Sequence, residues 1–361
     1  AVHDAIKARS DELWEDAKKY IKELHDKNKA KEQYDKNKAK EQVDDLVELS
    51  WVSAPYDGTQ KGYVKAREQA EALLAARKAT RNFKQPTWAS NMPKSSLDGA
   101  RESVIPASEY PERGDPNNDA LKKKNKENIE DLYKNYHARR GEQLSGVDLL
   151  KRLGSPKEAR KFKSTSDMAA IPFIQRLDKD EGRGQKLLQN LRALLPKDTD
   201  DLDRNDEGLI FESRLKDGFP QQELPDTEKS AFRELMKNLP TPNPYYALLA
   251  ADGDFMGKVI DNQADKAKHQ DISKILADFA TKAQKIIEKD DYQGIPIYSG
   301  GDDVLAYLPI NTVLKCAQEL EIVFRTDLSG YKSKEGKSPT LSIGIAIAHH
   351  LEPLSDALEL V

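Results

Sequence analysis

Two short clusters of aspartate and glycine lie in the C-terminal third of the sequence. The first holds Asp252, Gly253 and Asp254, and the second is Ser-Gly-Gly-Asp-Asp at residues 299–303. Carboxylate oxygens are the ligands that hard divalent cations such as Mg²⁺ and Mn²⁺ prefer. Two such ions about 3.5–4 Å apart activate an attacking hydroxyl and neutralise a leaving pyrophosphate. The residue types therefore predict phosphoryl transfer from a nucleoside triphosphate.

Glycines separate the acidic residues from the flanking apolar segments. Gly300 and Gly301 have no side chain, so a triphosphate can approach their backbone, and they permit the backbone angles of a tight turn. Taken singly, Gly-Gly-Asp-Asp is an ordinary hairpin tip, and Asp-Gly-Asp is an ordinary turn or helix cap. The catalytic interpretation depends on both clusters meeting in space, which the surrounding elements must achieve.

The apolar pattern after Pro244 predicts the elements that carry these clusters. Residues 245–251 form a short apolar run typical of a buried strand. An amphipathic helix follows, and its apolar stripe is Ile272, Ile275, Leu276, Phe279, Ala283, Ile286 and Ile287. Residues 295–299 and 304–308 then read as two strands of a hairpin with the glycines at its tip.

A second helix and a last strand complete the unit. Asn311 is the expected N-cap, and the residues expected to face inward are Val313, Leu314, Ala317, Leu320, Phe324 and Leu328. Residues 341–348 form the last strand. The order β-α-β-β-α-β is the split ferredoxin-like unit, an α+β fold and the topology of polymerase palms. Its first strand lies beside the hairpin, so the sequence predicts that both acidic clusters meet at one edge.

Composition limits the remaining possibilities. The chain has 361 residues, 33% of them charged, with a net charge of -4, and a mean hydropathy of -0.78. No run approaches the roughly 20 apolar residues of a membrane span, and residues 1–19 lack the apolar block of a signal peptide. Cys316 is the single cysteine, which excludes an internal disulfide. We expect no membrane association and a cytoplasmic location.

The length favours more than one domain. We expect an N-terminal helical and palm-like region at 1–130, a helical insertion with an acidic, proline-rich linker at 131–242, and the palm at 243–361. Residues 1–50 read as helix, with one buried face formed by Leu13, Trp14, Ala17, Tyr20, Ile21 and Leu24. The octamer DKNKAKEQ occurs twice, at 26–33 and 35–42, and predicts a long exposed helix or a mobile segment.

Two basic segments could contact RNA. The first holds Lys122, Lys123, Lys124 and Lys126, and the second holds Lys151, Arg152, Lys157, Arg160, Lys161 and Lys163. In a charge-rich protein such segments are also typical of solvated helix faces. On the sequence alone, solvated helix faces are the favoured interpretation, and RNA contact is the alternative.

Longer motifs around the two clusters resemble a known family. ADGDFMGKVID at 251–261, IYSGGDDVLAYLP at 297–309 and LSIGIAIAHHLEPLSDAL at 341–358 are similar to the large polymerase-cyclase subunit of type III CRISPR effector complexes, especially the type III-B form. KSSLDGARESVIP at 94–106, GEQLSGVDLLKR at 141–152 and FKSTSDMAAIPF at 162–173 also resemble that subunit.

The resemblance implies an antiviral enzyme that joins ATP through 3′–5′ linkages into cyclic oligoadenylates, using two Mg²⁺ or Mn²⁺ ions, when its complex binds target RNA. The implied partners are the other subunits of a type III-B complex, crRNA, target RNA and ATP. It also implies a second palm-like domain and a C-terminal helical domain, the latter absent from this sequence.

The implied site residues follow the motifs. Asp252 and Asp303 would be metal ligands, with Asp302 beside them in the catalytic acidic set. The residues implied to contact the nucleotide are Ser299, Gly300, Gly301, Gly253 and Asp254.

Two departures from the family limit what is carried over. Relatives often bear a zinc-binding cysteine pair where Ser145 and Asp148 stand here, so we expect no zinc and local helices held by packing alone. The dipeptides at His3 and His25 spell His-Asp, but too few further ligands exist for an HD nuclease, which we do not expect. The pair at 349–350 is not expected to chelate one ion, because adjacent strand residues point to opposite faces. One of them could face the nucleotide, but polar residues at the end of a strand are the favoured interpretation.

Three other functions remain possible. A diguanylate-type cyclase shares the palm, but residues 291–294, Asp-Tyr-Gln-Gly, contain no arginine where that family has an inhibitory site. An enzyme that joins ATP to another small molecule would use the same metal site. A structural scaffold for RNA and sister subunits would not need Asp252, Asp302 and Asp303 at one edge.

Overall fold

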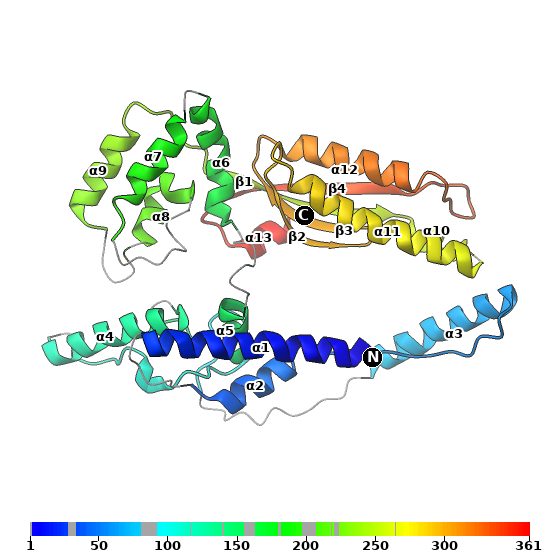
Figure 1. Ribbon diagram of the computed structural model, residues 1–361, viewed down its shortest axis with the longest axis horizontal. Coiled ribbons are helices and arrows are strands. Elements are labelled where there is room, and N and C mark those ends of the chain that lie inside the picture. Colours follow the sequence, from blue (N-terminus) through cyan, green and yellow to red (C-terminus); the bar gives the residue numbers. More distant parts are fainter. Residues whose placement is uncertain are drawn as a thin grey trace. The chain divides into compact units, whose positions relative to one another are not determined.

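The computed structural model describes residues 2–27, 34–80, 92–115, 117–138, 141–154, 163–179, 182–196, 207–217, 219, 224–263 and 265–361. The chain divides into two compact units (Figure 1), Ala1–Ser53 with Ala70–Arg160, and Ala54–Gln69 with Lys161–Val361. No helix in these described ranges is long and apolar enough to cross a membrane.

The first unit is helical. Its elements are α1 (Val2–Lys27), α2 (Lys36–Asp44), part of α3 (Gln60–Ala79), the short η1 (Ala107–Glu109), α4 (Asp119–Tyr136) and α5 (Gly146–Leu153). The predicted apolar face of α1 is confirmed, since Trp14, Ala17, Ile21 and Leu24 are buried and the two remaining residues of that face pack at its margin. This stripe packs against α4 and α5 because both present apolar residues at helical spacing.

The second copy of the repeated octamer forms most of α2. Asp35 caps the helix by accepting a hydrogen bond from the Lys38 backbone amide at 2.9 Å. Ala39 and Gln42 are fully buried. The expectation of an exposed or mobile segment is therefore wrong for this copy, because its alanine and glutamine pack inward. Most of the first copy, residues 28–33, lies outside the described residues.

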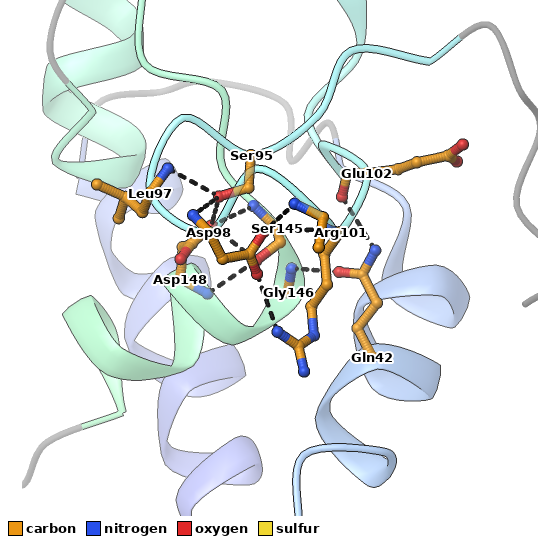
Figure 2. A network of polar contacts seen from close by, with 10 residues as sticks. Gln42, Ser95, Leu97, Asp98, Arg101, Glu102, Ser145, Gly146 and Asp148 are labelled. Atoms are coloured by element: carbon orange, nitrogen blue, oxygen red, sulfur yellow. Dashed lines mark hydrogen bonds and ion pairs between the residues drawn. The ribbon is translucent and has the colours of Figure 1, made fainter. Parts of the chain in front are cut away.

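A buried polar network joins α5 to the preceding loop (Figure 2). The Asp148 carboxylate accepts hydrogen bonds from Ser145 Oγ at 2.7 Å, from the Ser145 backbone amide at 2.8 Å and from Ser95 Oγ at 2.7 Å. Gln42 of α2 joins the same network, accepting a hydrogen bond from the Gly146 amide at the start of α5 at 2.7 Å and donating one to the Glu102 carbonyl at 3.0 Å. The prediction that packing alone holds these helices is wrong. A carboxylate that accepts three hydrogen bonds lies where relatives were expected to have a cysteine pair.

The second unit contains a four-stranded antiparallel sheet. Its strands are β1 (Tyr245–Asp254), β2 (Ile295–Gly300), β3 (Asp303–Leu308) and β4 (Thr340–His349), in the order β2-β3-β1-β4. Along the chain β1 is followed by α10 (Met256–Asp261) and α11 (Lys266–Ile287), β3 by α12 (Val313–Asp327), and β4 by α13 (Leu354–Glu359). The predicted α+β class is confirmed.

Helices α11 and α12, yellow and orange in Figure 1, cover one face of the sheet. Their buried residues pack on Ala247, Leu249 and Val304. The predicted stripe of α11 is confirmed, but Leu314 of α12 is 73% exposed and was wrongly placed inside. The predicted N-cap, Asn311, is also wrong, because the N-cap of α12 is the next residue, Thr312. The Thr312 hydroxyl donates to the Tyr292 carbonyl at 2.9 Å.

Helix α6 (Thr165–Asp178) covers part of the opposite face. Its Met168 and Ile171 pack with Tyr246 and Leu248 of β1. A capping box between Ser164 and Asp167 starts the helix. The other side of α6 forms a separate core with α7 (Arg183–Arg192), η2 (Glu207–Ile210), α8 (Glu212–Asp217) and α9 (Asp226–Met236). Residues of the expected 131–242 insertion thus pack on the palm sheet.

The cover that α6 provides ends partway along β1. On this face Tyr246 and Leu248 are buried, Ala250 is half-buried and Asp252 is exposed. The acidic end of the sheet therefore stays accessible on the face away from α11 and α12.

Candidate metal and nucleotide site

Strand alternation puts the acidic residues on the accessible face. Ala251 of β1 and its partner Val304 of β3 are buried against α11 and α12. Asp252 and Asp303 are the next residues outward on each strand, so their side chains point to the opposite face. Asp302 lies in the turn between β2 and β3.

The structure brings all three predicted catalytic carboxylates together. One carboxylate oxygen from each of Asp252, Asp302 and Asp303 lies within 4.8 Å of the others. A carboxyl contact with Asp252, followed by partial burial and the charge of Asp302, raises the pKa of Asp303. Burial, opposed by a backbone hydrogen bond and aided by the charge of Asp252, raises the pKa of Asp302. In both cases the charge of a neighbouring aspartate adds to the shift.

This donor set fits a hard divalent cation. It consists of carboxylate oxygens, and Asp252 and Asp303 are exposed, which leaves room for substrate oxygens in the coordination shell. A bound cation would offset the part of the two pKa shifts that comes from repulsion between the carboxylates. Asp252, Asp302 and Asp303 are therefore the residues that would hold Mg²⁺ or Mn²⁺.

The glycines have structural reasons for their places. Gly301 has a φ of +71°, which suits the first position of a two-residue hairpin turn. Gly253 lies against the catalytic turn, and a Cβ on it would fall 2.7 Å from the Cβ of Asp302 and 2.7 Å from Cγ of Met256. Gly253 thus allows β1 and the turn to approach closely.

Asp254 and Ser299 have partners outside the triad. Asp254 accepts hydrogen bonds from the hydroxyls of Thr340 and Ser342, both at 2.7 Å, and these bonds lower its pKa. It ties β1 to β4 beside the site. Ser299 faces α11, where its hydroxyl donates to the Ala280 carbonyl at 2.9 Å. Its side chain therefore lies on the face opposite Asp303, where it holds the hairpin to the helix.

Sequence reasoning missed two residues next to the site. Phe255 directly follows Asp254, has a φ of +61° and is 42% exposed. The ammonium of Lys337 lies 4.9 Å from the centre of its ring. A bulky residue with positive φ is strained, which often marks functional loops. The signal for Phe255 was its position after the first acidic cluster; the loop that holds Lys337 has no distinctive pattern.

The histidines at the end of β4 lie away from this site. His349 pairs with Tyr245 at the start of β1, whereas Asp252 pairs with Ser342. This placement agrees with the favoured interpretation, polar residues at the end of a strand, and not with a histidine that faces the nucleotide. Their rings also stack, 4.9 Å apart, because His350 lies just beyond the strand. His350 is buried against Phe211 and is hydrogen-bonded to Ser166 Oγ at 2.9 Å.

His25, of the second His-Asp dipeptide, is buried in the first unit. Its Nδ1 lies 2.7 Å from the Ile21 carbonyl and its Nε2 lies 3.2 Å from the Tyr136 hydroxyl. These contacts give it a packing role.

In the first basic segment three lysines pair with carboxylates: Lys122 with Asp119, Lys123 with Glu127 and Lys124 with Glu112. These pairs fit a solvated helix face, and RNA contact stays a prediction. Residues 155–162 of the second segment lie outside the described residues.

Comparison with known proteins identifies the palm. Residues 245–361 match the family model described as Cas10/Cmr2, second palm domain. Residues 245–361 thus carry a palm domain of the Cas10/Cmr2 type. The predicted resemblance to the polymerase-cyclase subunit of type III CRISPR complexes, in its type III-B form, is confirmed.

Two individual relatives extend this result. The chain is 29% identical over 233 residues to the CRISPR system Cmr subunit Cmr2 of Pyrococcus furiosus, covering 55% of this chain and 26% of the relative. It also resembles a chain in the cryo-EM structure of type III-B Cmr-beta in the apo state, with a TM-score of 0.51 and 13% identity, over 97% of this chain and 52% of that one. The second likeness concerns the fold alone. The match to the Pyrococcus furiosus protein spans about a quarter of that protein's length.

Proposed function

We propose that this palm transfers nucleotidyl groups from ATP and so produces cyclic oligoadenylates through 3′–5′ linkages. The observation that carries the proposal is the convergence of Asp252, Asp302 and Asp303 within 4.8 Å on the accessible face of the sheet. The Cas10/Cmr2 match over the same residues supports it. We also assign the βαββαβ order and the β2-β3-β1-β4 sheet to the ferredoxin-like arrangement.

Each acidic residue has a distinct part in this proposal. Divalent ions, when bound, would lower the barrier by activating the attacking 3′-hydroxyl and neutralising the leaving pyrophosphate. Asp252 and Asp303 hold the ions from two neighbouring strands, and Asp302 adds charge from the turn. Asp254 positions the end of β1 through Thr340 and Ser342. Gly301 leaves its backbone open to the triphosphate, because nothing lies within 4 Å of the place where its Cβ would stand, whereas the Tyr298 side chain lies against Gly300.

The larger setting is inferred from the family. We propose that the chain works within a type III-B effector complex with sister subunits and crRNA, and that target RNA switches on synthesis. The name of the Pyrococcus furiosus relative, a Cmr subunit, supports this setting. We retain 1–130, 131–242 and 243–361 as the proposed family domains, and a cytoplasmic location as the proposed site of action.

Product analysis tests the proposal. The assembled complex is incubated with ATP, Mg²⁺ or Mn²⁺ and target RNA, and the nucleotides formed are identified by mass spectrometry. Cyclic oligoadenylates are the expected products. Guanylate products from an ATP and GTP mixture would instead favour a diguanylate-type cyclase, and an adenylylated small molecule would favour a conjugating enzyme. If no nucleotide is consumed, the chain acts as a scaffold.

A further inference from the structure

Tyr298 is an aromatic residue placed beside the acidic triad with most of its side chain in solvent. It lies on β2, an edge strand of the sheet, and is 55% exposed. Its cross-strand partner is Leu305, two residues from Asp303 on β3. Leu305 and Asp303 share a face, so Tyr298 stands on the accessible face that carries the triad.

A β-bulge is responsible for this orientation. The pairing of β2 with β3 shifts between Pro296 and Tyr298, so Ile297 is an extra residue in the strand. If the register did not shift, Ile297 would pair with Leu305, and Tyr298 would pair with Val304 and point toward α11. Bulges beside active sites commonly redirect a side chain in this way. The same shift turns Ser299 toward the helix.

Gly300 makes room for the tyrosine ring. A Cβ on Gly300 would fall 2.3 Å from the Tyr298 hydroxyl oxygen and 2.7 Å from Cζ. The ring therefore lies along the strand toward the hairpin tip, over the backbone of Gly300. Asp303 is the cross-strand partner of Gly300, so the ring lies next to the triad on the same face of the sheet. A nucleotide whose phosphates are held by the triad can therefore bring its base to this ring.

We propose that Tyr298 is the surface on which the base of the bound nucleotide stacks while the triad holds the phosphates. This inference rests on the proposed nucleotidyl transfer. Aromatic rings stack on nucleobases favourably and with little preference for sequence. The neighbouring Phe255 fits the role less well, because the Lys337 ammonium already lies over its ring. Tyr298 is thus a positioning residue that holds the substrate through its base.

Comparing two ligands in the presence of Mn²⁺ tests this assignment. ATP carries a base and inorganic triphosphate does not, and the affinity of each is measured by calorimetry for the wild-type chain. Tyr298→Ala should weaken ATP binding about tenfold, the scale of one base stacked on an aromatic ring. Triphosphate binding should not change, and this ligand also reports that the site is folded. Tyr298→Phe should restore ATP affinity.

Tyr245→Ala is the matched control, since Tyr245 is an exposed tyrosine, 42% accessible, at the opposite end of the same sheet. It should leave both affinities unchanged. Equal ATP affinity in wild type and Tyr298→Ala would overturn the stacking role alone. A parallel loss of ATP and triphosphate affinity in that variant would show a general structural effect and would also overturn it. A wild-type chain that binds neither ligand with Mn²⁺ would instead contradict the proposed function.

Discussion

Gly253 of β1 lies directly against Asp302 of the hairpin turn, with no space for a Cβ between them. This contact joins the two acidic clusters that are separated by about fifty residues of chain. The distance between the carboxylates therefore depends on a residue that has no functional group of its own.

Replacing this glycine should loosen the site without unfolding it. In Gly253→Ala the new methyl group would push Asp302 and Met256 outward, so we expect Mn²⁺ affinity to fall by about tenfold or more, as for a metal site whose support is disturbed. Electron paramagnetic resonance of bound Mn²⁺ measures this. Gly257→Ala is the control, because a Cβ there meets nothing within 4 Å. Equal Mn²⁺ binding in both variants would contradict the packing argument.

Removing the turn carboxylates should separate stability from activity. The double variant Asp302→Ala, Asp303→Ala should form no nucleotide product while its melting temperature stays equal or rises slightly. The reason is that the raised pKa values of both groups show that their charges destabilise the folded metal-free protein. Thermal unfolding in EDTA measures the stability. A large drop in melting temperature would show that these residues support the fold.

The network around Asp148 should matter for the first unit. Asp148→Ala leaves three hydrogen-bond donors without this acceptor. Each buried donor that stays unsatisfied lowers the free energy of unfolding by about 1–3 kcal/mol. Unfolding of this unit should therefore require clearly less denaturant. Asp131→Ala, on the exposed side of α4, is the control. Because hydrogen bonds hold the site, EDTA should not change its stability. A large loss of stability in EDTA that added Zn²⁺ restores would contradict this prediction, because it would indicate a bound metal that Ser95, Ser145 and Asp148 do not account for.

His350 should make stability depend on pH. Burial, followed by the neighbouring charges of His349 and Arg214, lowers the pKa of His350 to about 4, against about 6.5 in an unfolded chain. Between these values the unfolded state binds more protons, so stability falls as pH falls from 6.5 toward 4. The loss is on the order of 1–3 kcal/mol. Denaturant unfolding at pH 7 and pH 5 should show a smaller difference in His350→Phe than in wild type; identical differences would contradict this assignment.

Much of the palm could be predicted because its elements have strong patterns. The stripe from Ile272 to Ile287 and the apolar strand runs are properties of local sequence. The convergence of Asp252 with Asp303 followed from strand order alone. Asp254 was harder, since its partners Thr340 and Ser342 become neighbours only through the register of β4, which no local pattern specifies.

Other features depend on tertiary packing. Ser299 was predicted to face the nucleotide, but the bulge at Ile297 reverses the alternation of β2. Helix α6 is buried on two sides, by the sheet and by α7, so periodicity could not indicate that it covers the palm. Leu314 shows the converse, because a single leucine at helical spacing can still face solvent.

The rate of pyrophosphate release from ATP tests the role of the triad most directly. It is measured in the assembled, target-RNA-bound complex with Mn²⁺, comparing wild type, Asp303→Asn and the control Asp291→Asn, whose side chain is exposed outside the triad. Asn keeps the shape of the residue and removes its charge, so Asp303→Asn should lower the rate at least about a hundredfold, while Asp291→Asn matches wild type. Near-normal release in Asp303→Asn would contradict a catalytic metal site at this position.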